Sequence, residues 1–148
     1  MKKLSVVLIW ILILGCEDST DVNKALLKET PVIVDGDWTI GKVYQNEVDI
    51  TDNFDFSSFS LTLNYSGENP TTFSISSTNK IPFVTAQTEG NWAFDNIIYP
   101  SKMHFIQGDT ATGIIAESLF SEDNSKIVVE FSMGCEDNIY AYHMIKSE

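Results

Sequence analysis

The sequence contains no arginine and little positive charge. Its nine basic residues are all lysines, against 21 Asp and Glu, which gives a formal charge of −12 over 148 residues. A chain this acidic repels the phosphates of nucleic acids, and it lacks the side chain best suited to gripping phosphate through paired hydrogen bonds. We therefore expect no nucleic-acid partner.

Metal-binding and catalytic residue types are also scarce. Two Cys and two His leave little material for a disulfide framework or a metal site with several ligands. His104 and His143 fall in separate predicted strands, and a shared site would still need a third ligand. The sequence has no Gly-x-Ser-x-Gly elbow or comparable nucleophile motif. We predict a non-enzymatic protein without a metal or cofactor.

The N-terminus has the features of an export signal. Two lysines precede an apolar run from Leu4 to Leu14, which is too short for a membrane span of about 20 residues. The sequence Ile13-Leu14-Gly15-Cys16 resembles the lipobox of bacterial lipoproteins. The resemblance implies that residues 1–15 are a signal peptide, that cleavage occurs before Cys16, and that Cys16 carries a lipid that anchors the chain to a membrane.

The residues after Cys16 are polar and acidic. Glu17 and Asp18 resemble the surface-export signal of Bacteroidota lipoproteins, although a solvated tether is an equal alternative. Loss of residues 1–15 leaves seven Lys against 21 acidic residues, a formal charge of −14. We predict a lipidated tether over residues 16–33 and one domain over 34–148, on the periplasmic or extracellular face of the outer membrane.

The predicted domain is all-β. Val, Ile, Thr, Phe and Tyr are frequent, and apolar residues alternate with polar ones in several short runs. The predicted strands are Trp38–Gln45, Phe59–Tyr65, Thr72–Ser76, Asn91–Asp95, Ile97–Tyr99, Met103–Gln107, Gly113–Phe120, Lys126–Met133 and Ile139–Lys146. The last three read as an antiparallel meander. About eight short strands favour a small antiparallel up-and-down barrel, with a β-sandwich as the alternative.

Several motifs give this pattern a family likeness. Gly36-Asp37-Trp38 resembles the Gly-x-Trp motif at the first strand of lipocalins. The segments Gly90–Asp95 and Tyr140–Lys146 are similar to lipocalin-like domains of Bacteroidota lipoproteins, whose functions are mostly unknown. The resemblance implies a barrel that Trp38 closes at one end. In lipocalins an Arg near the last strand packs over this Trp, whereas here Lys146 is the nearby cation.

The large aromatic residues are the candidate binding residues. Those expected to point inward either line a ligand pocket or fill a solid core, and they are Trp38, Phe73, Trp92, Phe94, Phe105 and Phe131. We predict a binding or accessory module that takes a small hydrophobic ligand. The alternative is a surface module that binds glycans or proteins and is associated with an outer-membrane uptake system. Its candidate surface aromatics are Tyr99 and Tyr140, and Trp92 is a third candidate for the same role.

Two loops complete the set of candidates. The cluster from Asp49 to Asp55 is rich in carboxylates, but it lacks the spacing and glycine of a calcium loop, so we interpret it as a solvated loop. Phe54, Phe56 and Phe59 follow and either fold inward or form the rim of a pocket. Cys135 lies between acidic residues in a turn, which indicates a spare thiol without a catalytic role.

Overall fold

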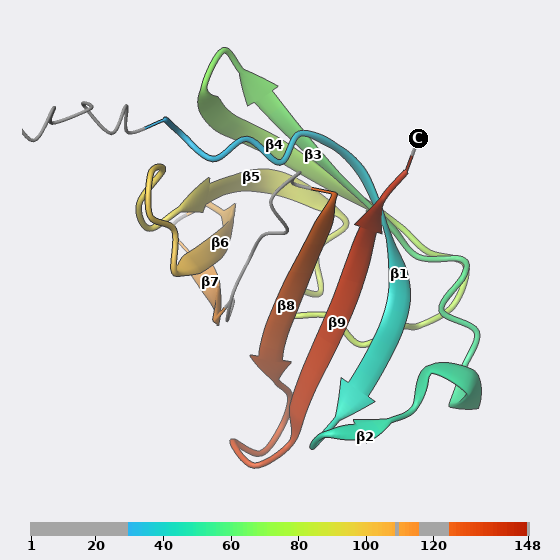
Figure 1. Cartoon of the computed structure of the whole chain (residues 1–148). Coiled ribbons are helices and arrows are strands. Elements are labelled where there is room, and N and C mark those ends of the chain that lie inside the picture. The colour runs from blue at the N-terminus through green and yellow to red at the C-terminus, as the bar shows by residue number, and fades with distance from the viewer. Residues whose placement is uncertain (1–29, 109, 116–124, 148) are drawn as a thin grey trace, which may run out of the picture.

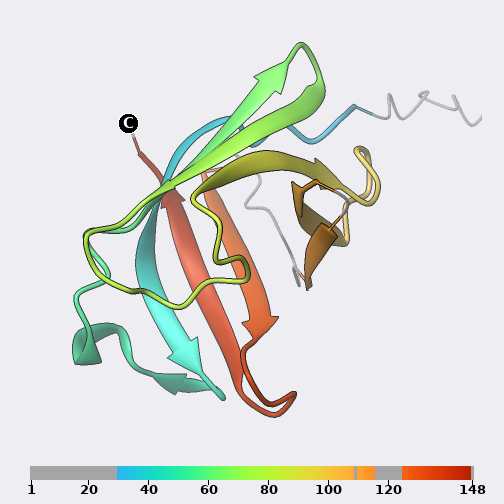
Figure 2. The same cartoon turned by 180° about the vertical axis from the view of Figure 1, so that it is seen from behind.

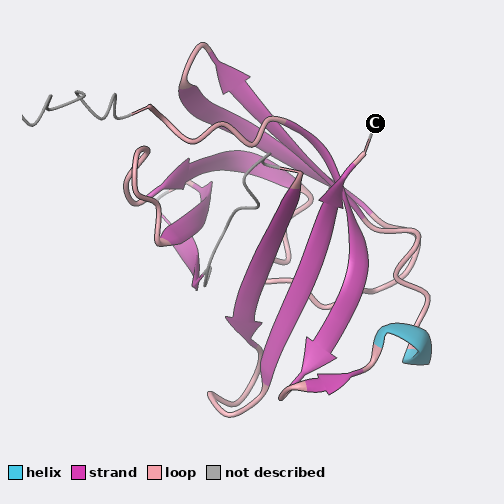
Figure 3. Ribbon diagram, viewed as in Figure 1, coloured by secondary structure: helices cyan, strands magenta, loops and turns pink. Residues whose placement is uncertain are grey.

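The computed structural model describes residues 30–108, 110–115 and 125–147 of the chain. Their regular secondary structure is β-strand joined by loops (Figure 3), apart from one short 3-10 helix, η1, at Thr51–Asn53. The strands are β1 (Gly36–Gln45), β2 (Val48–Asp49), β3 (Ser60–Ser66), β4 (Asn69–Ser76), β5 (Glu89–Phe94), β6 (Lys102–Gln107), β7 (Thr110–Ile115), β8 (Lys126–Ser132) and β9 (Ile139–Lys146). The predicted all-β class is confirmed.

The strands form one antiparallel sheet that curls back on itself. From β3 to β9 each strand pairs with the next along the chain, β1 pairs with β3, and β9 pairs back to β1. Eight strands thus complete the circuit that Figure 1 shows, while the two-residue β2 only extends the end of β1. This arrangement confirms the predicted small barrel of about eight strands, including the meander of β7, β8 and β9.

Alternation along the strands determines which side chains enter the core. In β8, Ile127, Val129 and Phe131 are buried, and the residues between them are partly exposed. In β3, Leu61 and Leu63 are fully buried. Because neighbouring residues of a strand point to opposite faces of the sheet, every strand with this pattern directs its apolar side chains inward. The buried hydrophobic residues of β1, β3 to β6, β8 and β9 belong to one cluster.

One predicted strand is wrong, and two others begin three residues earlier than predicted, β4 at Asn69 and β7 at Thr110. Ile97–Tyr99 is an irregular loop, because the Asn96 side chain accepts hydrogen bonds from the backbone N–H groups of Ile98 and Tyr99. Short polar side chains that form hydrogen bonds with nearby backbone groups in this way compete with strand pairing. The strand predicted at 113–120 begins at Thr110 as β7, and residues 116–120 lie outside the described residues.

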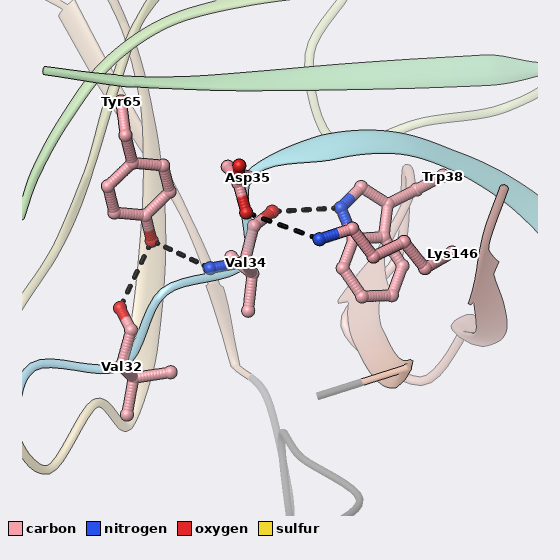
Figure 4. A network of polar contacts seen from close by, with 6 residues as sticks. All are labelled: Val32, Val34, Asp35, Trp38, Tyr65 and Lys146. Carbon is pink, nitrogen blue, oxygen red and sulfur yellow. Dashed lines mark hydrogen bonds and ion pairs between the residues drawn. The ribbon is translucent and has the colours of Figure 1, made fainter. Parts of the chain in front are cut away.

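One end of the barrel is covered by the chain that leads into β1 (Figure 4). Val32 donates a backbone hydrogen bond to the Ile97 carbonyl, and Val34 is fully buried. The Tyr65 hydroxyl donates to the Val32 carbonyl and accepts from the Val34 N–H, both at 3.2 Å. Burial raises the pKa of Tyr65 to about 12. The chain is therefore fixed to the barrel from Val32, two residues before the predicted domain boundary.

Trp38 and Lys146 meet at the same end. The Trp38 indole is fully buried and donates a hydrogen bond of 2.9 Å to the Val34 carbonyl. Lys146 is its cross-strand partner, and the Lys146 Nζ lies 3.2 Å from a carboxylate oxygen of Asp35. The ion pair is partly exposed, so it contributes about 0–1 kcal/mol. Packing of the indole, more than this charge pair, secures the end of the barrel.

The N-terminal features predicted from the sequence lie largely outside the described residues. Residues 1–15, Cys16 and the tether up to residue 29 are among those not described. Within the described part of the chain, no helix has the length and apolar character needed to span a membrane.

Candidate functional site

The interior of the barrel is filled by aromatic rings. All six aromatic residues predicted to line a pocket or a core are at most 7% exposed, and they are Trp38, Phe73, Trp92, Phe94, Phe105 and Phe131. The rings contact one another edge to face, with centroids 4.8 Å apart for Phe73 and Phe105 and 5.1 Å apart for Trp92 and Phe94. Of the two possibilities left open by the sequence, these residues form a core.

A further ring enters the core from a loop. Phe83 lies in the segment 77–88 between β4 and β5. This segment runs in front of β1 and β9 in the rear view (Figure 2, yellow-green). The Phe83 side chain is 7% exposed. Its ring centroid lies 5.2 Å from Phe59, 5.4 Å from Phe105 and 5.7 Å from Phe131. Phe83 therefore occupies space that a barrel of about eight strands can otherwise offer to a ligand.

Hydrogen bonding holds this loop segment against β9. The Tyr142 hydroxyl donates a hydrogen bond of 2.5 Å to the carbonyl of Pro82, the residue before Phe83. Burial raises the pKa of Tyr142, so the hydroxyl stays protonated and remains a donor throughout the physiological range. Tyr142 is fully buried and lies on the inward face of β9.

A cleft of about 450 Å³ opens beside this segment, at the end of the barrel away from Trp38. Four parts of the chain surround it: the end of β1 at Gln45, the loop from Ile50 to Phe56, the loop residues 79–82, and the start of β9. Its apolar lining consists of Ile50, Phe54, Phe56, Ile81, Pro82, Tyr140 and Tyr142. The volume lies within the range of about 300–1,000 Å³ that is typical of small-molecule sites.

The aromatic residues of the cleft form a series from solvent to core. Phe54 is 65% exposed, and its ring centroid lies 5.9 Å from that of the buried Phe56. Phe56 contacts Tyr142 in turn, at 6.0 Å. On the other side, the half-buried Tyr140 stacks on Phe131 at 5.7 Å, with 20° between the ring planes. A ligand entering the cleft would therefore meet rings whose positions are fixed by the core behind them.

Short turns hold the loop that carries Phe54. An oxygen of Asp49 accepts hydrogen bonds from the Thr51 N–H at 2.9 Å and from the Thr51 hydroxyl at 2.6 Å. Asp55 makes the same pair of bonds with Ser57, at 3.1 and 2.6 Å. These hydrogen bonds lower the pKa of both carboxyls, those from the Thr51 and Ser57 hydroxyls most. Phe54 lies between the two turns with an extended backbone.

Polar groups lie at one side of the cleft. Asp55, Asn79, Lys80 and Gln45 are among its lining residues. The Asn79 side-chain amide donates to the backbone carbonyl and to a carboxylate oxygen of Asp55, both at 3.3 Å, and so links the two loops. The cleft thus combines an apolar wall with one carboxylate, one ammonium group and two amides, which is the usual composition of a small-molecule site.

The three phenylalanines of the acidic loop have different positions. Phe56 and Phe59 fold inward, at 6% and 1% exposed, and Phe54 forms the rim. The carboxylates of the same loop serve the turns described above. Among the described residues there is no group of three or more His, Cys, Asp and Glu that could hold a metal ion.

The histidines and Cys135 are not brought together. His104 lies on β6 and His143 on β9, with β7 and β8 between these strands in the sheet. The His143 ring instead contacts Tyr44, at 5.0 Å between centroids. Cys135 is an exposed free thiol in the turn between β8 and β9.

The candidate surface aromatics have separate places. Tyr99 is 66% exposed in the loop between β5 and β6, close to the covered end of the barrel, whereas Tyr140 lies at the cleft. Trp92 is buried and donates a hydrogen bond of 3.2 Å to the Asn64 carbonyl. The sequence pointed to Phe54 and Tyr140 but gave no sign of Phe83, because that residue lies in a segment without strand alternation.

Comparison of the chain with models of protein families, with curated protein sequences and with solved structures finds no significant match.

Proposed function

We propose that this chain is a lipid-anchored binding module of the bacterial envelope or cell surface, lipocalin-like in type, which takes a small hydrophobic ligand and performs no catalysis. The observation that carries the proposal is the 450 Å³ cleft at the end of a barrel whose own interior is filled. The ligand site is therefore the mouth of the barrel and not its centre.

The lining of the cleft indicates the chemistry of the ligand. Rings from Phe54, Phe56 and Tyr140 offer flat apolar surface, which favours a ligand with an aromatic or other flat apolar part. Asp55 and Lys80 lie at the polar side, where they can meet a hydroxyl, amide or charged group of the same ligand. We expect a small amphipathic molecule with its apolar part against the rings.

The point where the N-terminal chain reaches the barrel and the cleft lie at opposite ends of the barrel. The chain reaches the barrel at Val32, next to the start of β1, and the other end of β1 is Gln45, which lines the cleft. Ten residues of strand span about 30 Å. A lipid on Cys16 would thus hold the covered end toward the membrane and leave the cleft facing away from it.

The alternative function is a surface module that binds glycans or proteins. Burial of Trp92 leaves Tyr99 and Tyr140 as the candidates for stacking on sugars. These two residues lie in different regions of the barrel, whereas the cleft brings several rings together, and this favours the hydrophobic ligand.

The test of the cleft is a titration with N-phenyl-1-naphthylamine, an uncharged fluorescent probe. A chain beginning at Glu17 is suitable, because the whole circuit of strands lies within residues 36–146. We expect one saturable site, and Phe54→Ser should weaken binding about tenfold, since the lost apolar contact is worth about 1.4 kcal/mol. Tyr99→Ser is the matched control, because Tyr99 is as exposed as Phe54 but distant from the cleft. Equal loss in both variants, or no saturable uptake, would refute the proposal.

The anchor is tested separately with the full chain expressed in a bacterium that makes lipoproteins. We expect labelled palmitate to be incorporated into the wild type and to be lost in Cys16→Ser, with Cys135→Ser as the control that keeps the label. Equal labelling of wild type and Cys16→Ser would disprove lipidation at this residue without affecting the result for the cleft.

A further inference from the structure

The last strand of the barrel carries apolar residues on both faces. Its inward residues include the buried Tyr142 and Met144. Its outward residues are Ile139, Ala141, His143 and Ile145, and the two isoleucines are 40% and 46% exposed. A strand that is apolar on both faces is typical of a sheet covered on both sides.

The outer faces of β3 and β4 differ from that of β9. The residues of β3 and β4 between the buried ones are Ser60, Thr62, Thr72 and Ser74, all small and polar, as expected for a face in contact with water. The outward apolar residues of β9 are therefore a local feature and not a general property of this barrel. This difference singles out the outer face of β9 and its neighbours as an interaction surface.

The outer face of β9 also contains a groove. The groove has a volume of about 650 Å³, and Ile139, Ala141, Tyr44 and His143 are among its lining residues. The Tyr44 and His143 rings lie 5.0 Å apart across the pairing of β1 and β9. Ala141 leaves open space between the larger side chains. We call this feature the β9 groove, and it is separate from the cleft at the end of the barrel.

The carboxylates are the charged groups that the β9 groove has in its lining, and they come from three places in the chain. Glu47, Glu130 and Asp137 are among its lining residues, and the lining includes no lysine. Two lysines lie beside the outer face of β9, Lys42 opposite His143 and Lys126 opposite Ile145. A second copy of the chain would bring the same carboxylates and a formal charge of −12 against this face, and like-charge repulsion opposes such a contact.

We propose that the β9 groove docks a basic amphipathic segment of a partner protein. Apolar side chains of that segment would cover Ile139 and Ala141, and its lysines or arginines would meet Glu47, Glu130 and Asp137. A cationic group can also lie over the Tyr44 ring, where the π-face attracts positive charge. The occupant thus combines the two features that the groove presents, an apolar floor and a rim of carboxylates.

The test uses a fluorescein-labelled peptide of alternating leucine and lysine as the probe, with binding to the chain from Glu17 followed by fluorescence anisotropy. A second peptide with serine in place of leucine has the same charge and should bind about tenfold more weakly, because the floor of the groove is apolar. Binding should also weaken about tenfold between 50 and 500 mM salt, since salt screens the carboxylates.

Two matched pairs of variants locate the site. Ile139→Lys should reduce affinity at least tenfold, whereas Ser74→Lys, which adds the same charge on the outer face of β4, should reduce it less than threefold. Glu130→Gln should weaken binding about threefold, and Glu68→Gln in the turn between β3 and β4 should leave it unchanged. The glutamate pair keeps the test decisive if Ile139→Lys does not fold.

Three outcomes would overturn the proposal. Equal effects within each matched pair would show that the peptide responds to overall charge and not to the groove. Equal affinity of the two peptides would exclude an apolar floor as the determinant. Sedimentation of the protein as a dimer that Ile139→Lys dissociates would show that a second copy covers the groove.

Discussion

Replacing Phe83 with alanine tests whether the loop segment 77–88 is an integral part of the core. The Phe83 side chain is 7% exposed, and its ring contacts those of Phe59, Phe105, Phe131 and Tyr142 with centroid distances of 5.2 to 6.3 Å. The change removes a whole ring from a site where other rings surround it. The neighbouring strands are held in the sheet and cannot move inward to fill the space.

The expected loss follows from the burial. A buried Phe replaced by Ala typically costs 3–5 kcal/mol, which includes the lost transfer energy and the cavity left behind. Phe83 belongs to a loop that can shift toward the vacated space, so we place the loss near the lower limit, at about 3–4 kcal/mol. For a domain of this size, such a loss lowers Tm by about 10–15 °C.

The assay is urea and thermal unfolding followed by the fluorescence of Trp38 and Trp92, both of which are buried. Phe54→Ala is the matched control, because the same side chain is removed from a position that is 65% exposed, and it should cost less than about 1 kcal/mol. The vacated space should also bind benzene or a molecule of similar size, which would partly restore Tm. If Phe83→Ala and Phe54→Ala unfold at the same temperature, Phe83 does not occupy the core.

Two further predictions concern a loop and a close contact between strands. Asp95 accepts hydrogen bonds from the Ser101 hydroxyl and from backbone N–H groups of residues 96, 101 and 102, which hold its pKa well below the usual value. Its charged form therefore stabilises the fold above about pH 4, and this contribution is lost as the pH falls below 4. Asp95→Asn should lower Tm by a few degrees at pH 7 and by less at pH 2, and equal losses at both pH values would contradict this. Gly90→Ala would place a methyl group 2.7 Å from the Ile106 carbonyl oxygen and 2.8 Å from the Phe73 ring, so we expect a loss of about 2–3 kcal/mol in urea unfolding. Gly41→Ala, which meets only the flexible end of the exposed Ile145 side chain at 2.5 Å, should cost less than half as much.

The strands of this barrel are predictable because alternation and burial agree. In β8 every second residue is apolar, and each of Ile127, Val129 and Phe131 lies in the core. The order of the strands is also simple, since most of them pair with their neighbours in sequence. The closing pair of β1 and β9 joins the two ends of this sequential order. Local patterns therefore determine most of the architecture.

The loops are less predictable, because their conformation depends on individual hydrogen bonds and on packing. Ile97–Tyr99 has the residue types of a strand. The Asn96 side chain, however, accepts hydrogen bonds from the backbone N–H groups of Ile98 and Tyr99, and these groups would otherwise pair with a neighbouring strand. Phe83 has no alternating neighbours, and its burial depends on the space left between rings from distant strands. For the cleft, the sequence indicated Phe54 and Tyr140 separately but gave no sign that residues 79–82 lie between them.

The filling of the barrel explains why the candidate sites lie at its end and on its outer face. Large aromatic side chains from the strands and Phe83 from a loop fill the centre of the barrel, and a cleft lies between the two loops at the barrel end. Tyr140 and Tyr142 of β9 form one wall of this cleft, and Ile139 and Ala141 of the same strand line the β9 groove outside. Because β9 is paired along most of its length with both β1 and β8, both surfaces rest on a rigid strand. A rigid strand positions binding side chains with little loss of conformational entropy on binding, which is the arrangement expected of a binding module.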